Sequence, residues 1–175
     1  MNANIRRDIR LVAISLLLSA FPIACFADSQ TVNSIINLKQ PQAQILVGGQ
    51  PDTSQLNALA EADIKHVINL RPQTELPKFP EEDLVRTAEM SYHLLPVASI
   101  DDLSLANVQA LDQLIEQAGD EKIFIHCASG NRVGAMMALR SALIYGEDPQ
   151  RALEIGKTWG MTSLEAEIRQ LLNKS

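Results

Sequence analysis

The chain has 175 residues, enough for one domain with a buried core, and carries a formal charge of −6. Hydrophobic residues make up 46% and charged residues 21%, as is ordinary for a globular protein. Aromatic residues make up only 4%, which argues against the stacking platforms that bind single-stranded nucleic acid.

The first 27 residues have the order of a secretory signal peptide. Three arginines precede an apolar run at 11–24 that is too short for a comfortable membrane span, and small residues follow it. We expect cleavage after Ala27 and a periplasmic or secreted mature chain. One alternative is a retained N-terminal anchor. Another is lipidation at Cys25, whose preceding proline and isoleucine fit a lipobox poorly.

Without residues 1–27 the chain keeps 12 basic and 20 acidic residues, a formal charge of −8. So acidic a chain argues against nucleic acid or an anionic membrane as a partner. Cys127 is then the single cysteine, which excludes an internal disulfide. No integral membrane segment is expected in the mature chain.

Residues 28–43 are polar and are expected to be a flexible lead-in, so the folded domain is placed at 44–175. Short apolar runs bounded by turn residues predict strands, and capping or acidic residues before periodic apolar positions predict helices. In the first half these patterns predict a strand from 45 that runs into a turn, a helix capped by Asp52 or Thr53, a strand at 65–70, a loop at 71–80, a helix at 81–90 and a strand at 92–97.

The second half continues this alternation of strands and helices. Its patterns predict a loop at 98–104, a helix from 105 to Gly119, a strand at 122–126, a helix from Arg132 to about Tyr145, a helix opened by Pro149 and a last helix opened by a capping box from Thr162 to Glu165. Together the elements predict an α/β sandwich with a mostly parallel central sheet flanked by helices. In such sheets ligands bind at the carboxyl ends of the strands, where Cys127 falls.

The segment "IHCASGNRVGAM" (125–136) joins the strand at 122–126 to a helix and has the features of an anion site. Gly130 allows the backbone to turn, and the helix N-terminus presents unpaired N–H groups and a positive dipole. Arg132 can donate two hydrogen bonds to a tetrahedral oxyanion, and the same positive field favours the nucleophilic thiolate form of Cys127. The alternative for this cysteine is a structural role as a small buried residue.

The stretch "HCASGNR" (126–132) resembles the signature of the cysteine-dependent tyrosine and dual-specificity phosphatases, although four residues rather than five separate the cysteine from the arginine. This Cys–x4–Arg spacing is similar to that of the bacterial phosphatase-like domains related to β-lactamase-hydrolase-like proteins. Those domains also share "GQP", here at 49–51, followed by a helix and "VINLR", here at 67–71. With "LLPV" at 94–97, the resemblance covers roughly residues 44–172.

The resemblance implies a cysteine-phosphatase-like fold and the hydrolysis of phosphate monoesters. It implies that Cys127 attacks phosphorus to form a phosphocysteine, and that Arg132 and the loop N–H groups hold the phosphate oxygens. His126 would support the loop. No metal or cofactor is implied, and the partner is a phosphorylated protein or small molecule. The loop residues implied in substrate binding are Ala128, Ser129, Gly130 and Asn131.

Related phosphatases carry a general acid after the "PV" strand, and the nearest acids here are Asp101 and Asp102. Acids are equally expected at the N-terminal turn of the next helix for structural reasons.

The Cys–x4–Arg length is also that of rhodanese-like sulfurtransferases, so a persulfide carrier is an alternative function. A non-catalytic anion-binding domain is a further alternative, because no acid occupies the usual position. His66 and His93 have the spacing of no evident metal site.

Overall fold

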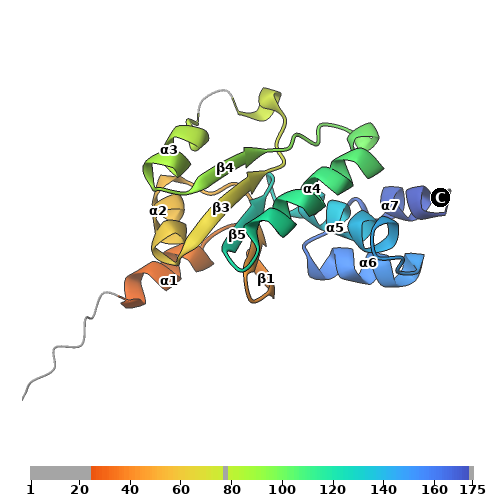
Figure 1. Ribbon diagram of the computed structural model, residues 1–175, viewed down its shortest axis with the longest axis horizontal. Helices are drawn as coiled ribbons and strands as arrows, with labels where there is room; N and C mark the ends of the chain where they lie inside the picture. Colours follow the sequence, from red (N-terminus) through yellow and green to blue (C-terminus); the bar gives the residue numbers. More distant parts are fainter. Residues whose placement is uncertain (1–24, 77–78, 174–175) are drawn as a thin grey trace, which may run out of the picture.

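The computed structural model describes residues 25–76 and 79–173, with side chains from residue 29 on. A five-stranded sheet lies at its centre (Figure 1). In the order β1-β2-β5-β3-β4, all neighbouring strands are parallel except β1 and β2, which are antiparallel. The expected α/β sandwich with a mostly parallel sheet is therefore confirmed. The strands are β1 (Lys39–Gln42), β2 (Ile45–Gly48), β3 (Ile64–Asn69), β4 (Ser91–Leu94) and β5 (Lys122–His126).

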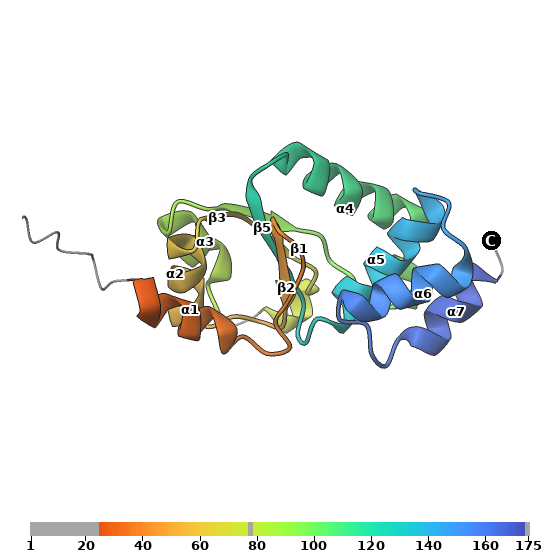
Figure 2. The same ribbon diagram turned by 90° about the horizontal axis from the view of Figure 1, so that it is seen from below.

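Helices lie on both sides of the sheet (Figure 2). One side carries α1 (Cys25–Asn33), α2 (Thr53–Glu61) and α3 (Glu81–Thr87). The other side carries α4 (Leu105–Ala118), α5 (Asn131–Leu143), α6 (Pro149–Thr158) and α7 (Glu165–Leu172). Two short 3-10 helices, η1 (Gln73–Glu75) and η2 (Ile100–Asp102), lie in the loops that follow β3 and β4.

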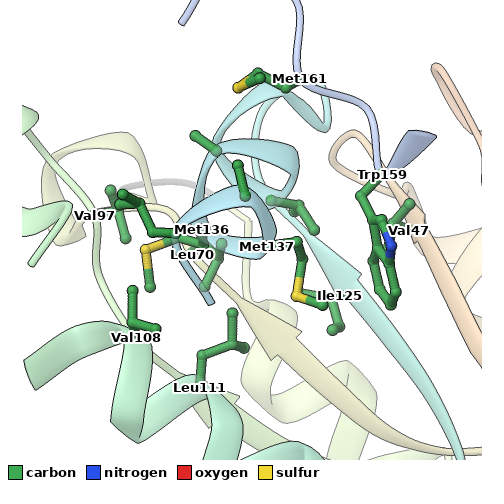
Figure 3. Packing of buried hydrophobic residues seen from close by; sticks show 14 of the residues in the cluster. Val47, Leu70, Val97, Val108, Leu111, Ile125, Met136, Met137, Trp159 and Met161 are labelled. Atoms are coloured by element: carbon green, nitrogen blue, oxygen red, sulfur yellow. The ribbon is translucent and has the colours of Figure 1, made fainter. Parts of the chain in front are cut away.

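The central strand β5 contributes to two separate cores, because successive side chains of a strand point to opposite faces. Ile123 and Ile125 belong to the core that includes residues of α4, α5 and α6, whereas Phe124 belongs to the core that includes residues of α2. Figure 3 shows Ile125 near Met137 and Trp159 in the first of these cores. Burial of each such side chain contributes about 1.5–3 kcal/mol, so the strand that leads to the cysteine loop is anchored on both faces.

Helices α5 and α6 approach so closely that only glycine fits between them. A Cβ atom on Gly134 would lie 2.0 Å from Met161 N and 2.5 Å from Gly156 O. The chain that follows α6 therefore packs directly on α5, the helix that begins at the cysteine loop. This contact fixes the position of the first turn of α5.

Residues 28–43 differ from the expected flexible lead-in. They contain most of α1 and all of β1, and Val32 and Ile35 are buried in the core beside α2. Strand β1 lies at the edge of the sheet and pairs irregularly with β2, a position that tolerates Pro41. The prediction is corrected because two apolar side chains among polar neighbours are enough to dock this short helix.

Most other predicted elements are confirmed within a few residues, including the helix capped by Asp52. Strand β4 ends at Leu94, three residues before the expected end. The capping box predicted for the last helix is wrong: α7 begins at Glu165, and its N-cap position has no side-chain cap. The Thr162 N–H donates instead to Asn131 Oδ1 at 2.7 Å. A tertiary hydrogen bond has thus replaced the local one that the pattern suggested.

Residues 1–24 of the predicted signal peptide lie outside the described part of the chain. The expected cleavage after Ala27 would fall in the first turn of α1. Among the described residues, none of the helices combines the length and apolar character needed to cross a membrane.

Candidate active site

Four loops lie at the carboxyl ends of the parallel strands, where this topology places ligand sites. They begin at Gly49 after β2, at Leu70 after β3, at Leu95 after β4 and at Cys127 after β5. Strand β3 lies between β5 and β4 in the sheet. The loop after β4 stays close to β3, because the Val97 N–H donates to Leu70 O at 3.0 Å.

The loop after β5 presents backbone N–H groups around a buried sulfur. Cys127 is 1% exposed, and its Sγ accepts a hydrogen bond from Gly130 N at 3.1 Å. Gly130 has φ 87°, in the left-handed region that favours glycine. The first bond of α5 runs from Gly134 N to Gly130 O, so the N–H groups of residues 131–133 have no acceptor within the helix. An anion here would meet these N–H groups and the positive end of the helix dipole.

The outer side of this loop is held by neighbouring segments. Ala128 O accepts a hydrogen bond from Gln50 N at 3.3 Å, and Ser129 O accepts one from Asn37 Nδ2 at 3.0 Å. The C=O and N–H groups of a trans peptide point in opposite directions. The N–H groups of Ser129 and Gly130 are therefore directed away from these segments, and that of Gly130 reaches the sulfur.

The Asn131 side chain contacts the segment before α7, and the substrate-binding role of this residue stays a prediction. Its side chain donates to Ser163 Oγ at 2.8 Å and accepts from Thr162 N at 2.7 Å. These two bonds tie the start of α5 to the turn before α7. The backbone N–H of Asn131 is the group that could contact an anion.

Arg132 lies in the first turn of α5 and is partly buried. Its Nη1 donates to Val97 O at 3.0 Å and its Nη2 to Glu75 Oε2 at 2.7 Å. The hydrogen bond from Arg132 holds the pKa of Glu75 below its ordinary range. Burial lowers the pKa of Arg132, whereas the contacts with Glu75 and Cys127 raise it by a larger amount. The pKa of Arg132 therefore lies above its ordinary value. The guanidinium is therefore a fixed positive charge beside the sulfur.

Three residues that the sequence analysis did not assign to the site connect its loops: Gln50, Arg71 and Glu75. The Arg71 guanidinium donates to Gln50 Oε1 and to Glu75 O. Through Glu75 this chain of contacts continues to Arg132. Gln50 belongs to "GQP", which follows β2, and Arg71 belongs to "VINLR", which covers the end of β3. A polar side chain just after each of these strands was the sequence signal that could have identified Gln50 and Arg71 as site residues.

The two candidate acids lie in η2, in the loop that follows β4. Asp102 Oδ2 accepts hydrogen bonds from the N–H groups of Ser99 at 2.9 Å and Ala98 at 2.8 Å. The Ser99 bond, and then the Ala98 bond, lower the pKa of Asp102, so this carboxylate caps its own turn in the ionised form. Asp101 faces a separate surface groove that also holds Glu167. The general-acid role of either residue stays a prediction.

A cavity of about 150 Å³ opens beside Arg132. Most of its wall is apolar and comes from the loop after β4 and from the residue that precedes α7. Such a recess next to an anion loop can hold the organic part of an ester. It is lined by Val97, Ala98, Ser99, Ile100, Leu103, Arg132 and Leu164.

His66 and His93 contact each other on neighbouring strands, away from this site. His66 Nδ1 lies 3.3 Å from His93 Nε2, and His66 Nε2 lies 2.7 Å from Glu121 Oε2. Burial lowers the pKa of His93. Within the described ranges, no group of three His, Cys, Asp or Glu side chains is arranged to hold a metal ion.

A mostly parallel sheet whose central strand leads through a Cys–x4–Arg loop into a helix fits the cysteine-phosphatase class. Residues 19–171 match the family described as DSP-PTPase phosphatase fused to NAD+ kinase. Because this match covers most of the chain, the protein belongs to that family. The resemblance inferred from the loop and from the "GQP" and "VINLR" stretches is thereby confirmed.

Curated relatives of the chain include β-lactamase hydrolase-like proteins. The protein from Xylella fastidiosa (strain Temecula1 / ATCC 700964) is 29% identical over 104 residues, which cover 57% of this chain and 24% of the relative. The protein from Agrobacterium fabrum (strain C58 / ATCC 33970) is 28% identical over 121 residues, which cover 67% of this chain and 28% of the relative. The chain thus spans about a quarter of the length of these relatives.

Solved structures share the fold over most of the chain. A DUF442 protein from Shewanella putrefaciens CN-32 is 26% identical, with a TM-score of 0.66, over 83% of this chain and 92% of that one. The kinase-associated phosphatase is 16% identical, with a TM-score of 0.55, over 81% of this chain and 98% of that one. In the latter structure the catalytic-site cysteine is replaced by serine. At this low identity the likeness shows the fold alone.

Proposed function

We propose that the chain hydrolyses phosphate monoesters through a phosphocysteine on Cys127. The observation that carries the proposal is the position of Cys127 Sγ, 3.1 Å from Gly130 N, at the base of a loop whose unpaired N–H groups lead to Arg132. These N–H groups and the guanidinium are the donors that stabilise the equatorial oxygens of a phosphoryl group in transfer. The Gly130 N–H stabilises the thiolate before attack and when it leaves.

The proposed reaction has two steps that use the same sulfur. The Cys127 thiolate first attacks phosphorus, an S–P bond forms, and the P–O bond to the leaving group breaks. The leaving oxygen takes a proton from an acid or from solvent. A water molecule then attacks phosphorus, the S–P bond breaks, and inorganic phosphate leaves as the thiolate is restored.

We propose that the preferred substrates are aryl phosphates or other esters with good leaving groups. Asp102 caps its own turn and Asp101 lines another groove, and these contacts support weak protonation of the leaving oxygen. Without a placed acid, departure is fastest when the leaving oxygen is itself stable as an anion. The apolar cavity beside Arg132 suits the organic group of such an ester.

Hydrolysis of para-nitrophenyl phosphate without added metal tests this mechanism. The expected result is turnover by the wild type, complete loss in Cys127→Ser, and a loss of about 100-fold or more in Arg132→Ala. Turnover that survives Cys127→Ser would contradict a phosphocysteine. Phosphate binding without turnover would favour a non-catalytic anion site, and transfer of sulfur from thiosulfate to cyanide would favour a sulfurtransferase.

We also propose that the protein is exported after cleavage of its signal peptide. The support is the order of basic, apolar and small residues in 1–27. Mass spectrometry of the chain from a fractionated bacterial host tests it. A periplasmic chain that starts at Asp28 is expected, whereas a cytoplasmic chain that still starts at Met1 would contradict export, and a lipid on Cys25 would identify an anchor.

A further inference from the structure

Glu81 is a buried carboxylate directly behind the cysteine loop, and the proposed mechanism does not use it. It opens α3 and is only 2% exposed. Its Oε1 accepts a hydrogen bond from Gln50 Nε2 at 2.8 Å, and its Oε2 accepts one from Asn69 Nδ2 at 2.6 Å. Both partners are donors, so the ionised carboxylate is the form that these contacts satisfy.

His126 lies between this carboxylate and the nucleophile. It is fully buried, and its ring stacks on Phe124 with centroids 5.4 Å apart. Its Nε2 lies 3.0 Å from Glu81 Oε1, an ion-pair contact in which the N–H direction is not aligned as in a regular hydrogen bond. Its Nδ1 lies 3.3 Å from Cys127 O. With Glu81 ionised, each ring nitrogen faces an oxygen that can only accept.

The two protonation states of His126 satisfy these contacts differently. A neutral imidazole has one N–H, so one of its nitrogens would direct a lone pair at an oxygen. The imidazolium has an N–H on both nitrogens, and both contacts are then attractive. A buried imidazolium in turn needs a counter-ion, and Glu81 is the carboxylate placed to serve.

We propose that Glu81 is a positioning residue that keeps His126 protonated on both ring nitrogens, so that a positive charge lies directly behind Cys127. This charge adds to the field of Arg132 and of the α5 N-terminus, and favours the thiolate. The proposal deepens the proposed function, because a thiolate is the nucleophile that a phosphocysteine requires.

The other polar groups around Glu81 are consistent with this charge distribution. Burial raises the pKa of Tyr92 to about 12, so its phenol, 3.0 Å from Asn69 Nδ2, stays neutral. The Arg71 guanidinium donates to Gln50 and Glu75 and does not bond to Glu81 directly. The Glu81–His126 contact is thus the direct ion pair of this buried cluster.

Glu81 also holds the loop through Gln50. The Gln50 side chain donates to Glu81, while its backbone N–H donates to Ala128 O inside the loop. Removal of the carboxylate would therefore change both the charge on His126 and the support of Ala128. The direction of the change in thiolate formation separates these effects. Loss of a nearby negative charge alone would favour the thiolate, whereas loss of the imidazolium would disfavour it.

The first test is direct and uses the unaltered chain. The sequence holds three histidines, so two-dimensional 15N–1H spectra of the imidazole rings can be assigned with His126→Gln as the reference. At about pH 7 the expected pattern for His126 is that of an imidazolium, with both nitrogens protonated. The pattern of a neutral tautomer would overturn the proposal. This readout needs neither turnover nor a Glu81 variant that folds.

The second test measures thiolate formation in Glu81→Gln, with Glu82→Gln as the matched control. Glu82 is the exposed neighbour that pairs with Arg86 on the outer face of α3. Ultraviolet absorbance of the thiolate is followed against pH, and the spectrum of the same chain with Cys127→Ser is subtracted so that Cys25 cancels. In folded Glu81→Gln the midpoint is expected to rise by about one pH unit, and in Glu82→Gln to stay unchanged.

An unchanged or lower midpoint in folded Glu81→Gln would overturn the proposal. Because the absorbance titration needs no substrate, its outcome is independent of whether the chain is a phosphatase. A raised midpoint in a protein that hydrolyses no phosphate ester would leave the positioning role intact and reject the proposed function.

Discussion

Replacing Gly134 by alanine should destabilise the protein, although alanine is the better helix former. In an unpacked helix interior this change would add about 1 kcal/mol of stability. Here the new Cβ would lie 2.0 Å from Met161 N and 2.5 Å from Gly156 O, both of them backbone atoms that cannot rotate away. Ordinary contact begins at 3.4 Å, so the chain at Met161 must move by roughly 1.4 Å relative to α5.

The size of the effect follows from the kind of atoms in contact. Overpacking of a core costs about 1–3 kcal/mol, and more where backbone has to move. Because backbone atoms are in contact, we take the upper end of this range, about 3 kcal/mol, and subtraction of about 1 kcal/mol for helix propensity leaves a net loss of about 2 kcal/mol. For a chain of this length, each kcal/mol lowers the melting temperature by about 2–4 °C, which gives a decrease of roughly 4–8 °C.

Thermal unfolding of Gly134→Ala beside Gly156→Ala measures this. A Cβ on Gly156 would lie 2.8 Å from Ala138 Cβ and 2.9 Å from both Gly134 O and Met161 Cε, which are less severe approaches than 2.0 Å, so a smaller decrease is expected. Movement of Met161 would also strain the bond from Thr162 N to the loop, so phosphate binding should weaken in Gly134→Ala. A melting temperature equal to that of the wild type would refute the close approach of α5 and α6.

The remaining predictions concern two charged side chains near the loop. Arg132→Lys keeps the charge but loses the planar fork that reaches Val97 O and Glu75 from two nitrogens, so turnover of an aryl phosphate should fall by about 100-fold. The exposed Arg151→Lys should leave turnover unchanged. Asp102→Asn should lower the melting temperature at neutral pH, because the pKa of the Asp102 carboxyl is depressed in the folded chain and its ionised form stabilises the fold. This stabilisation is present at pH values above the ordinary carboxyl pKa and is lost as the pH falls below about 4. Loss of rate on alkyl but not aryl phosphates in Asp102→Asn would instead identify a general acid.

The cysteine loop could be located from the sequence because every signal for it is local. Three consecutive apolar residues within 122–126 predict the strand, Cys127 follows it, and Gly130 permits the turn before the helix. Strand order was not needed to place the loop, since the carboxyl end of any parallel strand is a possible site. The structure confirms the strand and helix bounds within one or two residues.

The residues that support the loop could not be identified in the same way. The stretch "EEDL" at 81–84 has the acids that a helix N-terminus favours, and nothing in it marks Glu81 as the buried one. Its burial results from long-range packing against Asn69 and His126, which lie on different strands. Likewise, Asn37 has no local pattern that predicts a bond to Ser129, 92 residues away.

The short loop raises the question of whether one missing residue removes an essential donor. In this chain Arg132 lies in the first turn of α5, immediately after Asn131, so the arginine and the unpaired N–H groups of 131–133 belong to the helix rather than to the loop. The positive φ of Gly130 reverses the chain so that this first turn faces the sulfur. Shortening the loop therefore removes chain between Cys127 and the helix while the donors of the helix N-terminus remain. The same argument explains why Asn131 is braced by Thr162 and Ser163: when donors come from the start of a helix, the position of that helix sets their geometry.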